Sequence, residues 1–292
     1  IEKRKGIKLN VFAIANSKKV LLNKNGVSSN WKNEISNNGV LYTINDVIAY
    51  ANENHLENLI AIDNTASAPF VENYIDLIES SFDLISSNKV ANTLSYKFYK
   101  KLREVLADNQ KNYLYETNVG AGLPLIDTIK LLHLSGENVT KIKGVFSGTL
   151  SYLFNIFSAE DRPFSQVLQE AIDKGFTEPD PREDLCGNDV GRKLLILARE
   201  LDLQNEFEEI AIQNLIPEHL REGDKAGFLN RLQELDAIYA EIKQNQKPNY
   251  VLRYIGELSG DLQQDKGNLE VKLVSVPSDT ALGGLKGSDS FF

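Results

Sequence analysis

The chain has 292 residues, which is enough for one large domain or two medium-sized domains with a sizeable core. Hydrophobic residues make up 42% and charged residues 25%, and apolar runs such as Leu194–Ala198 are far shorter than the ~20 residues that cross a bilayer. Acidic residues outnumber basic ones by 41 to 32, giving a formal net charge of −9. We therefore expect neither a membrane nor a nucleic acid as a partner.

Cysteine usage predicts a reducing environment. Cys186 is the only cysteine, so no internal disulfide can form and stability has to come from packing. The first residues lack the long apolar core and small-residue cleavage site of a signal peptide. A cytoplasmic location is expected.

The first part of the chain alternates short apolar runs with helical stretches. The expected strands are Leu9–Ala15, Asn58–Asp63, Phe82–Ser86 and Asn112–Glu116. The expected helices are Thr43–Asn54, Ala68–Ser80 and Asn92–Asn109. This alternation is typical of βαβ units and a parallel sheet, in which ligands bind beyond the carboxyl ends of the strands.

After about residue 130 the pattern changes, which predicts two domains, 1–130 and 131–292. The expected helices are Gly148–Phe157, Phe164–Lys174, one ending at Glu200, and Ala226–Asn245. The expected strands are Val139–Phe146, Tyr250–Leu258 and Asn268–Val276. Helices followed by successive strands indicate an α+β second domain, and its two last strands are candidates for pairing across a two-fold axis.

The segment from Glu116 to Pro124 (ETNVGAGLP) contains two glycines and lies between an expected strand and an expected helix. Gly120 and Gly122 permit a sharp turn, but no third glycine completes a dinucleotide fingerprint. Two readings stay open. The segment is either a structural strand-to-helix turn or a cation site built from a carboxylate and turned-out carbonyl groups.

Five acidic residues crowd the segment from Thr177 to Lys193 (TEPDPREDLCGNDVGRK). Asn188 is a good N-cap for the next helix, on which Asp189 and Lys193 are four residues apart and share a face. A lysine at the start of an apolar helix is costly unless it is paired or functional. The segment is either a salt-bridge loop that caps a core helix, or a group of carboxylates that bind an amino-acid substrate beside a proton-transferring lysine.

The remaining candidates favour structural roles. The hydroxyl groups of the segment Ser147–Tyr152 are expected to cap a helix. His55, His133 and His219 are scattered and have no metal-ligand spacing. A nucleophilic Cys186 would need a nearby base, and no histidine lies in its loop.

Three stretches resemble the homoserine dehydrogenase family: YETNVGAGLP, VFSGTLSYLFN and GFTEPDPREDLCGNDVGRKLLILARE. They are most similar to the dehydrogenase half of the bifunctional aspartokinase/homoserine dehydrogenases, and the likeness extends over nearly the whole chain. The resemblance implies NAD(P)-dependent interconversion of L-homoserine and L-aspartate 4-semialdehyde in threonine and methionine biosynthesis. It implies an α/β fold, with a Rossmann-like parallel-sheet domain and an α+β substrate-binding and dimerisation domain.

The resemblance also implies roles for individual residues. Lys193 matches the proton-transferring lysine, Glu178 and Asp189 match substrate-binding acids, and Asp184 matches a further acid of the site. Thr65 and Lys89 match cofactor contacts, and Lys18, with its neighbour Lys19, stands where the family often has an arginine. A lysine at this last position favours a 2′-phosphate, so NADP is expected rather than NAD. Four positions match a sodium-type cation site: the Glu116 side chain and the carbonyl groups of Val119, Ala121 and Leu123.

Two parts of the family pattern are missing from the sequence. The family's opening strand with its GxGxxG-type loop, and its glycine-rich closing segment, are not present, so both domains are expected to be incomplete. A homodimer or larger homo-oligomer is expected, as is a fused aspartokinase domain in the natural protein. Two alternatives remain: a catalytically silent regulatory or scaffold domain, and an aspartate-semialdehyde dehydrogenase, which would need an activated Cys186.

Overall fold

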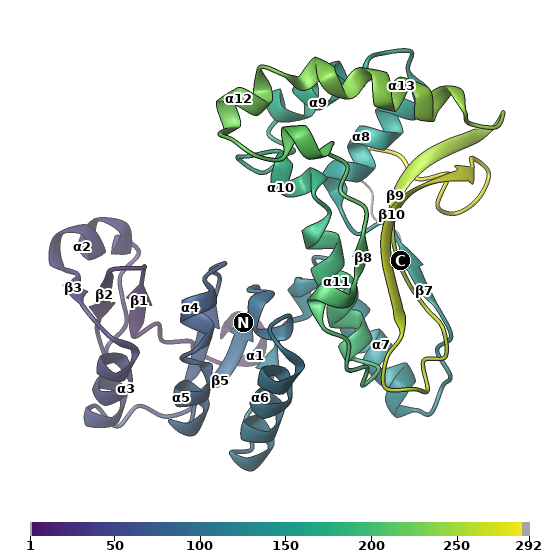
Figure 1. Ribbon diagram of the computed structural model, residues 1–292. Helices are drawn as coiled ribbons and strands as arrows, with labels where there is room; N and C mark the ends of the chain where they lie inside the picture. Colours follow the sequence, from purple (N-terminus) through teal and green to yellow (C-terminus); the bar gives the residue numbers. More distant parts are fainter. Residues whose placement is uncertain (1, 288–292) are drawn as a thin grey trace. The chain divides into compact units, whose positions relative to one another are not determined.

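The computed structural model describes residues 2–287 (Figure 1). It divides into two compact units. Unit 1 comprises the chain up to Ser86 together with Lys100–Leu114, and unit 2 comprises Ser87–Tyr99 together with the chain from Tyr115 onward. The predicted boundary near residue 130 stays a prediction.

Unit 1 contains the predicted parallel sheet. Its strands, in the order β4-β5-β6, are β4 (Ile60–Asp63), β5 (Asp83–Ser86) and β6 (Tyr113–Leu114). The connecting helices are α4 (Ala68–Val71), α5 (Tyr74–Glu79) and α6 (Tyr96–Asp108), the last of which begins in unit 2. Strand–helix alternation was therefore read correctly, although the helix predicted at 68–80 is broken in two.

The prediction for Leu9–Ala15 was wrong in length and in sheet. Only Ala13–Ala15 forms a strand, β1, and it pairs antiparallel with β2 (Lys19–Leu22), which pairs antiparallel with β3 (Val40–Leu41). The Asn16 side chain causes this, because its carboxamide oxygen accepts hydrogen bonds from the backbone amides of Lys18 and Lys19 at 2.9 and 2.8 Å and closes a tight hairpin. The other helices of this part are α1 (Glu2–Lys5), α2 (Trp31–Asn38) and α3 (Ile44–Glu53).

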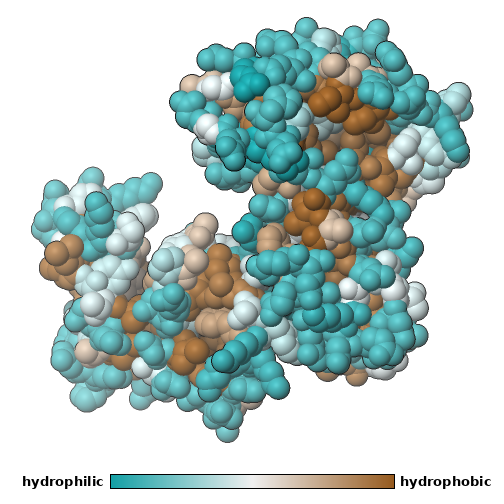
Figure 2. Space-filling model, viewed as in Figure 1, coloured by the Kyte–Doolittle hydropathy of each residue, from teal (hydrophilic) through white to brown (hydrophobic). Residues whose placement is uncertain are grey.

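The parallel sheet of unit 1 buries one face and exposes apolar residues on the other. Leu84 is 2% exposed, whereas Ile62 and Leu114 are 63% and 59% exposed. Alternate residues of a strand point to opposite faces, which explains the contrast. Hydrophobic residues are visible at the surface among mainly hydrophilic ones (Figure 2).

Unit 2 is built on a mixed four-stranded sheet in the order β7-β9-β10-β8. The strands are β7 (Ile142–Gly144), β8 (Ala211–Ile212), β9 (Tyr250–Ser259) and β10 (Asn268–Pro277). β9 pairs antiparallel with β7 and β10, and β10 pairs parallel with the short β8. The mixed sheet agrees with the predicted α+β class, and the ten-residue strands β9 and β10 match the last two predicted strands.

Unit 2 also contains helices, some of which contact this sheet. They are α7 (Leu125–Leu134), α8 (Gly148–Ala159), α9 (Phe164–Asp173), α10 (Arg182–Leu185), α11 (Asn188–Arg199), α12 (Lys225–Leu229) and α13 (Asp236–Gln244). Five 3-10 turns complete the described elements: η1 (Val90–Asn92), η2 (Glu116–Asn118), η3 (Phe207–Glu209), η4 (Glu218–Leu220) and η5 (Leu232–Leu235). The helix predicted at 226–245 was wrong as one element, because it is divided into α12, η5 and α13.

Helix α11 combines a buried apolar half with charged residues near its start. Its residues Leu194–Ala198 are all fully buried, as their uninterrupted apolar pattern predicted. Its first turn, by contrast, holds Asp189 and leads to Lys193. Because the second half of α11 is packed in the core, the backbone that carries Asp189 and Lys193 is held in a fixed position.

Candidate active site

The start of α11 depends on a glycine that the sequence reading overlooked. Gly187, not Asn188, occupies the N-cap, and Asn188 is the first helical residue, so the predicted cap was wrong. Gly187 has a φ of 79°, in the left-handed region that favours glycine. A Cβ on Gly187 would lie 2.0 Å from the hydroxyl oxygen of Tyr254 on β9, so the sheet and the helix start approach closely here.

Lys193 is held at two points. Its Nζ lies 2.7 Å from Oδ2 of Asp189, one helical turn earlier, and donates a hydrogen bond of 2.8 Å to the carbonyl oxygen of Phe146. Its side chain is only 18% exposed. The predicted shared face of Asp189 and Lys193 is therefore confirmed, and the ion pair explains how a lysine is tolerated at the start of a buried helix.

Asp189 lies between two lysines. Its Oδ1 is 3.4 Å from Nζ of Lys89, which comes from a segment 100 residues earlier in the chain. Burial by itself raises the pKa of the Asp189 carboxyl, but the charges of Lys193 and Lys89 outweigh it and the net pKa is lowered. Asp189 is therefore ionised at neutral pH, and it orders both ammonium groups.

Asp184, on the short helix α10, contacts Glu178, which precedes that helix. Oδ2 of Asp184 accepts a hydrogen bond of 2.8 Å from the backbone amide of Glu178, whose own side chain is exposed. Burial raises the pKa of Asp184, helped by the negative charges of Glu178 and Asp189 and opposed by hydrogen bonds from the Glu178 amide and Thr149. The carboxylates of Asp184 and Glu178 therefore provide negative charge that suits a cationic group of a ligand.

These five residues, which we call the Lys193 cluster, are Lys193, Asp189, Lys89, Asp184 and Glu178. All five belong to unit 2. Between residues 2 and 287, no group of three or more His, Cys, Asp or Glu residues is arranged to hold a metal ion. A surface hollow of about 390 Å³ formed by α8, α9 and α13 contains none of the five, so it is separate from the cluster.

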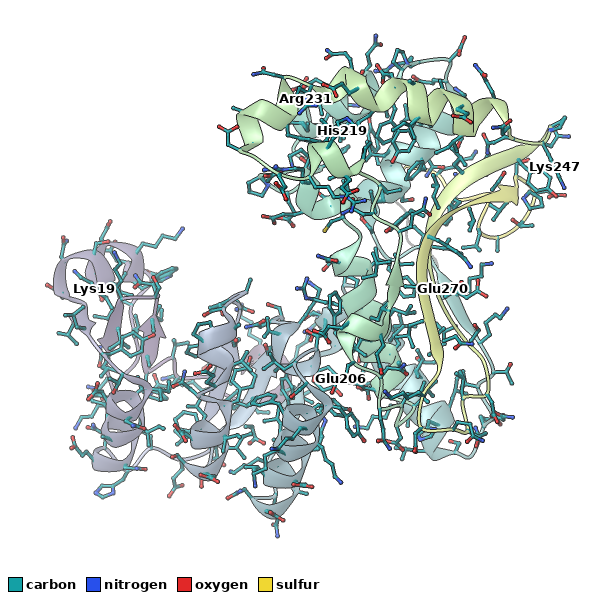
Figure 3. All side chains as sticks on the ribbon, viewed as in Figure 1. Lys19, Glu206, His219, Arg231, Lys247 and Glu270 are labelled. Carbon is teal, nitrogen blue, oxygen red and sulfur yellow. The ribbon has the colours of Figure 1, made fainter. Side chains whose placement is uncertain are left out.

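The predicted cofactor residues Thr65 and Lys18 both lie in unit 1. Thr65 is the second residue after β4. Its amide donates a hydrogen bond of 2.8 Å to Oδ1 of the buried Asp63, and its hydroxyl accepts one of 3.1 Å from the amide of Ser67. Lys18 is exposed in the β1–β2 hairpin. Lys19, labelled in Figure 3, instead directs its Nζ to the carbonyl oxygen of Ser36 at 2.8 Å.

The predicted cation-site residues surround the turn before α7. Both carboxylate oxygens of Glu116 accept backbone hydrogen bonds at the start of this helix, from Ile126 at 2.8 Å and Asp127 at 3.0 Å. Glu116 therefore caps α7, an effect that the sequence did not reveal. Ala121 has a left-handed φ of 52°, Val119 is buried and Leu123 is 54% exposed.

Cys186, His133 and His219 each contact another residue outside the Lys193 cluster. The Cys186 thiol donates to the carbonyl oxygen of Glu183 at 3.2 Å. His133 pairs with Asp202 at 2.9 Å and His219 pairs with Glu234 at 3.1 Å. These contacts agree with structural roles for the three residues.

The sequence did not predict two features of the cluster. One is the Phe146 carbonyl that binds Lys193. The other is Gly256 on β9, where a Cβ would lie 2.9 Å from the Phe146 ring, so the glycine allows that residue to sit where it does. A glycine inside a predicted strand signals close approach of another group and was the available clue.

Within the described part of the chain, every helix is too short or too polar to span a membrane.

Family comparisons agree with this architecture. Residues 124–292 match the homoserine dehydrogenase family, and residues 1–116 match the homoserine dehydrogenase NAD-binding domain. The bifunctional aspartokinase/homoserine dehydrogenase of Buchnera aphidicola is 39% identical over 98% of this chain and 35% of its own length. The homoserine dehydrogenase of Emericella nidulans is 38% identical over 79% of this chain and 65% of its own. The chain thus spans about a third of the bifunctional relatives that it matches.

Solved structures share the fold. A Candida auris protein of unknown function has a TM-score of 0.84 at 30% identity, covering 96% of this chain and 80% of its own. A homoserine dehydrogenase from Archaeoglobus fulgidus, described as putative in its source, has a TM-score of 0.71 at 20% identity, covering 97% of this chain and 78% of its own, which supports the fold alone. With more than half of its residues matched by the family pattern, the chain belongs to the homoserine dehydrogenase family.

Proposed function

We propose that the protein containing this chain catalyses the NAD(P)-dependent interconversion of L-homoserine and L-aspartate 4-semialdehyde. The observation that carries the proposal is the Lys193–Asp189 ion pair of 2.7 Å, placed at the start of a buried helix beside Asp184 and Glu178. The pair provides a cationic proton donor next to acids that can bind an amino group, and this reaction needs both.

Lys193 is the proton-transferring residue in this proposal. Reduction of the aldehyde places negative charge on its oxygen, and the Lys193 ammonium donates a proton there. In the reverse direction the neutral amine removes the hydroxyl proton of homoserine. Asp189 holds the ammonium in position, and the Phe146 carbonyl limits its rotation through a second hydrogen bond.

Glu178 and Asp189 bind the substrate. The exposed Glu178 carboxylate faces solvent and is available for the substrate ammonium, while the Asp189 carboxylate lies beside the reacting hydroxyl. Asp184 acts on Glu178 through its backbone amide, so it fixes the loop as well as adding negative charge. A small dipolar amino acid is the substrate class that such a carboxylate-rich region suits.

The residues of unit 1 fit a nucleotide cofactor. Thr65 lies at the carboxyl end of β4, the position where parallel sheets bind such ligands, and buried Asp63 fixes its amide. We assign Thr65 to the nucleotide, and Lys18 to the 2′-phosphate of NADP, with Lys89 of unit 2 as a further cofactor contact. When bound, the cofactor supplies or accepts the hydride, and the residues of the chain position the substrate and move the proton.

We further propose a monovalent cation of the sodium type at Glu116 and the carbonyl groups of Val119, Ala121 and Leu123. Each Glu116 oxygen accepts a single amide hydrogen bond and retains a lone pair for a cation. A homodimer or larger assembly, a fused aspartokinase domain and a cytoplasmic location complete the proposal. The bifunctional relatives support the fused domain.

The decisive experiment uses the natural full-length protein, with NADPH oxidation measured against aspartate semialdehyde and homoserine identified as product. Lys193→Ala is expected to lower kcat by at least ~100-fold, the usual scale for loss of general acid–base catalysis. Lys143→Ala is the matched control, because Lys143 also pairs with a carboxylate of unit 2, Glu257 at 3.1 Å, outside the cluster. Near-normal turnover by Lys193→Ala, or an inactive wild-type protein, would rule out the assignment.

A further inference from the structure

Arg199, the last residue of α11, is a large charged side chain with no solvent exposure. Burying a guanidinium group costs free energy unless its hydrogen bonds and charge are satisfied. Its Nη1 donates to the carbonyl oxygen of Asn92 at 2.6 Å, and its Nη2 lies 3.4 Å from Oε2 of Glu206. Its guanidinium carbon lies 5.0 Å from the centre of the Tyr99 ring.

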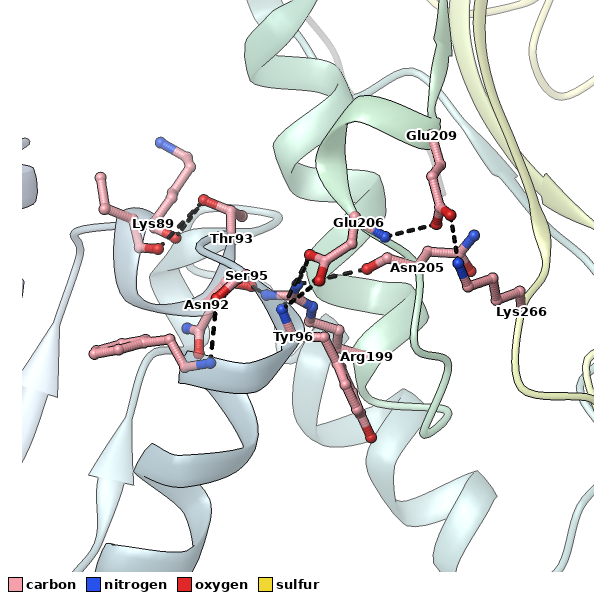
Figure 4. Close-up of polar contacts among 12 residues, drawn as sticks. Lys89, Asn92, Thr93, Ser95, Tyr96, Arg199, Asn205, Glu206, Glu209 and Lys266 are labelled. Atoms are coloured by element: carbon pink, nitrogen blue, oxygen red, sulfur yellow. Dashed lines mark hydrogen bonds and ion pairs between the residues drawn. The ribbon is translucent and has the colours of Figure 1, made fainter.

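Two partners of Arg199, Asn92 and Tyr99, belong to the segment 87–99, which also contains Lys89 (Figure 4). Glu206 holds the same segment at a second point, because its two oxygens accept hydrogen bonds from the Tyr96 amide at 2.9 and 3.0 Å. Arg199 and Glu206 therefore form a coupled pair. Arg199 binds the Asn92 carbonyl group, and Glu206 binds the Tyr96 amide.

The 3-10 turn η1 connects this anchor to Lys89. The Asn92 amide donates to the Lys89 carbonyl oxygen at 3.2 Å, and the Thr93 hydroxyl donates to the same oxygen at 3.1 Å. Asn92 is itself buried, with its side-chain amide 3.1 Å from the Asn118 oxygen. A shift of the Asn92 carbonyl would therefore move the Lys89 backbone.

Helix α11 thus contacts the segment near both of its ends. Asp189 in the first turn forms an ion pair with Lys89. Arg199, ten residues later and about 15 Å along the helix, donates a hydrogen bond to the Asn92 carbonyl oxygen. We propose that Arg199 is a positioning residue for the reaction: by fixing η1 against the end of α11, it keeps the Lys89 ammonium on Asp189 and so maintains the charge balance around Lys193. The catalytic consequence rests on the proposed function.

A guanidinium group is required for this role. Its planar fork reaches Asn92 and Glu206 at once, whereas an ammonium group is a single point of charge on a shorter side chain. Arg199→Lys keeps the charge and loses the double contact. In the full-length protein we expect it to lower kcat/KM for aspartate semialdehyde by roughly 10- to 100-fold, the scale of a small misplacement of a reacting group.

A double-mutant cycle with Lys89→Ala separates positioning from general stabilisation. If Arg199 acts through Lys89, Arg199→Lys will change kcat/KM by less than about twofold once Lys89 has been removed, because the two losses are not additive. Equal fold-losses in both backgrounds would overturn the proposal.

A second readout does not depend on activity. Lys89 is expected to react roughly threefold faster with an amine-specific reagent in folded Arg199→Lys than in the wild type, because a lysine released from its carboxylate partner is less protected. Lys143 is the matched control, since its side chain is 35% exposed against 30% for Lys89 and it pairs with Glu257. Unchanged Lys89 reactivity would overturn the inference, whereas an inactive wild-type protein with the expected reactivity would overturn only the proposed function.

Glu206→Ala keeps the test decisive if Arg199→Lys does not fold. The Glu206 side chain is 36% exposed, so its removal leaves a smaller defect than loss of the buried guanidinium group. It removes the Tyr96 anchor and the charge that orients Arg199, and we expect the same rise in Lys89 reactivity. A folded Glu206→Ala protein with wild-type Lys89 reactivity would reject the mechanism.

Discussion

Gly187 and Tyr254 approach so closely that a methyl group on the Gly187 α-carbon would lie 2.0 Å from the Tyr254 hydroxyl oxygen. The same glycine has a φ of 79° and begins the helix that carries Asp189 and Lys193. We expect Gly187→Ala to lower the free energy of unfolding by about 2–4 kcal/mol, from left-handed strain together with steric overlap. Urea denaturation followed by circular dichroism measures this loss.

Gly175→Ala is the control for that variant. Gly175 has a similar φ of 69°, but no atom lies within 4 Å of its added methyl group. It should therefore lose only the conformational part, about 1–2 kcal/mol. Equal losses in the two variants would show that the contact with Tyr254 is unimportant.

Gly256→Ala is predicted to act on Lys193 at a distance. The added methyl group would lie 2.9 Å from the Phe146 ring and displace the residue whose carbonyl oxygen binds the Lys193 ammonium. We expect kcat to fall by roughly tenfold or more, because small displacements of a reacting group are costly. Phe146→Leu in the same chain makes room for the methyl group and should restore part of the activity. Absence of any rescue would place the defect elsewhere.

Asp184→Asn should stabilise the fold while impairing function. Burial raises the pKa of Asp184, so the folded state disfavours the ionised form, and above the unfolded-state pKa this charge lowers stability. The amide retains an oxygen for the Glu178 backbone. We expect a gain of about 0.5–1 kcal/mol at pH 7 and a raised KM for the amino-acid substrate.

The pH dependence checks the cause of the Asp184→Asn effect. Below the unfolded-state pKa, near ~4, both states of wild-type Asp184 are protonated, so the difference between the two proteins should vanish at about pH 3. Thermal unfolding at pH 7, 5 and 3 follows it. A gain that persists unchanged at pH 3 would contradict the electrostatic explanation.

The ionised Asp189 carboxylate should stabilise the fold, whereas the ionised Asp184 carboxylate destabilises it. Its pKa is lowered by Lys193 and Lys89, so its contribution to stability is complete above the unfolded-state pKa and is lost as the pH falls through the lower folded-state value. Asp189→Asn should therefore flatten the decline in stability between about pH 5 and pH 3. Because the Asp189 side chain is 46% exposed, we expect a difference of less than about 1 kcal/mol at pH 7, reduced further by 1 M salt.

Glu116 is predicted both to cap helix α7 and to bind a cation. Glu116→Gln keeps one oxygen for an amide of the helix start, so it should lose less than about 1 kcal/mol of stability, whereas Glu116→Ala should lose about 1–2 kcal/mol. If the carboxylate binds sodium, activity at constant ionic strength will fall when NaCl is replaced by choline chloride, and Glu116→Gln will abolish that dependence. Identical activity in the two salts would restrict Glu116 to capping.

Local spacing explains which parts of the fold could be predicted. The helix predicted from Thr43, and the apolar positions of α8, α9 and α11, depend on residues within one or two turns of each other. The antiparallel β1–β2 hairpin and the break within 226–245 were missed. A short apolar run has the same appearance in either kind of sheet, and packing rather than propensity decides where a long amphipathic stretch divides.

The sequence by itself determined that Asp189 and Lys193 meet, because four residues make one turn of a helix, and it identified the acidic loop before them. Only the tertiary structure decided that Lys89 joins Asp189 from 100 residues away, that Phe146 offers its carbonyl oxygen to Lys193, and that Arg199 fixes Asn92. Such contacts depend on how the chain folds back on itself, and spacing along the sequence carries no record of that path. The Asp189–Lys193 pair therefore depends on neighbours in the sequence, whereas the contacts that position this pair depend on the tertiary structure.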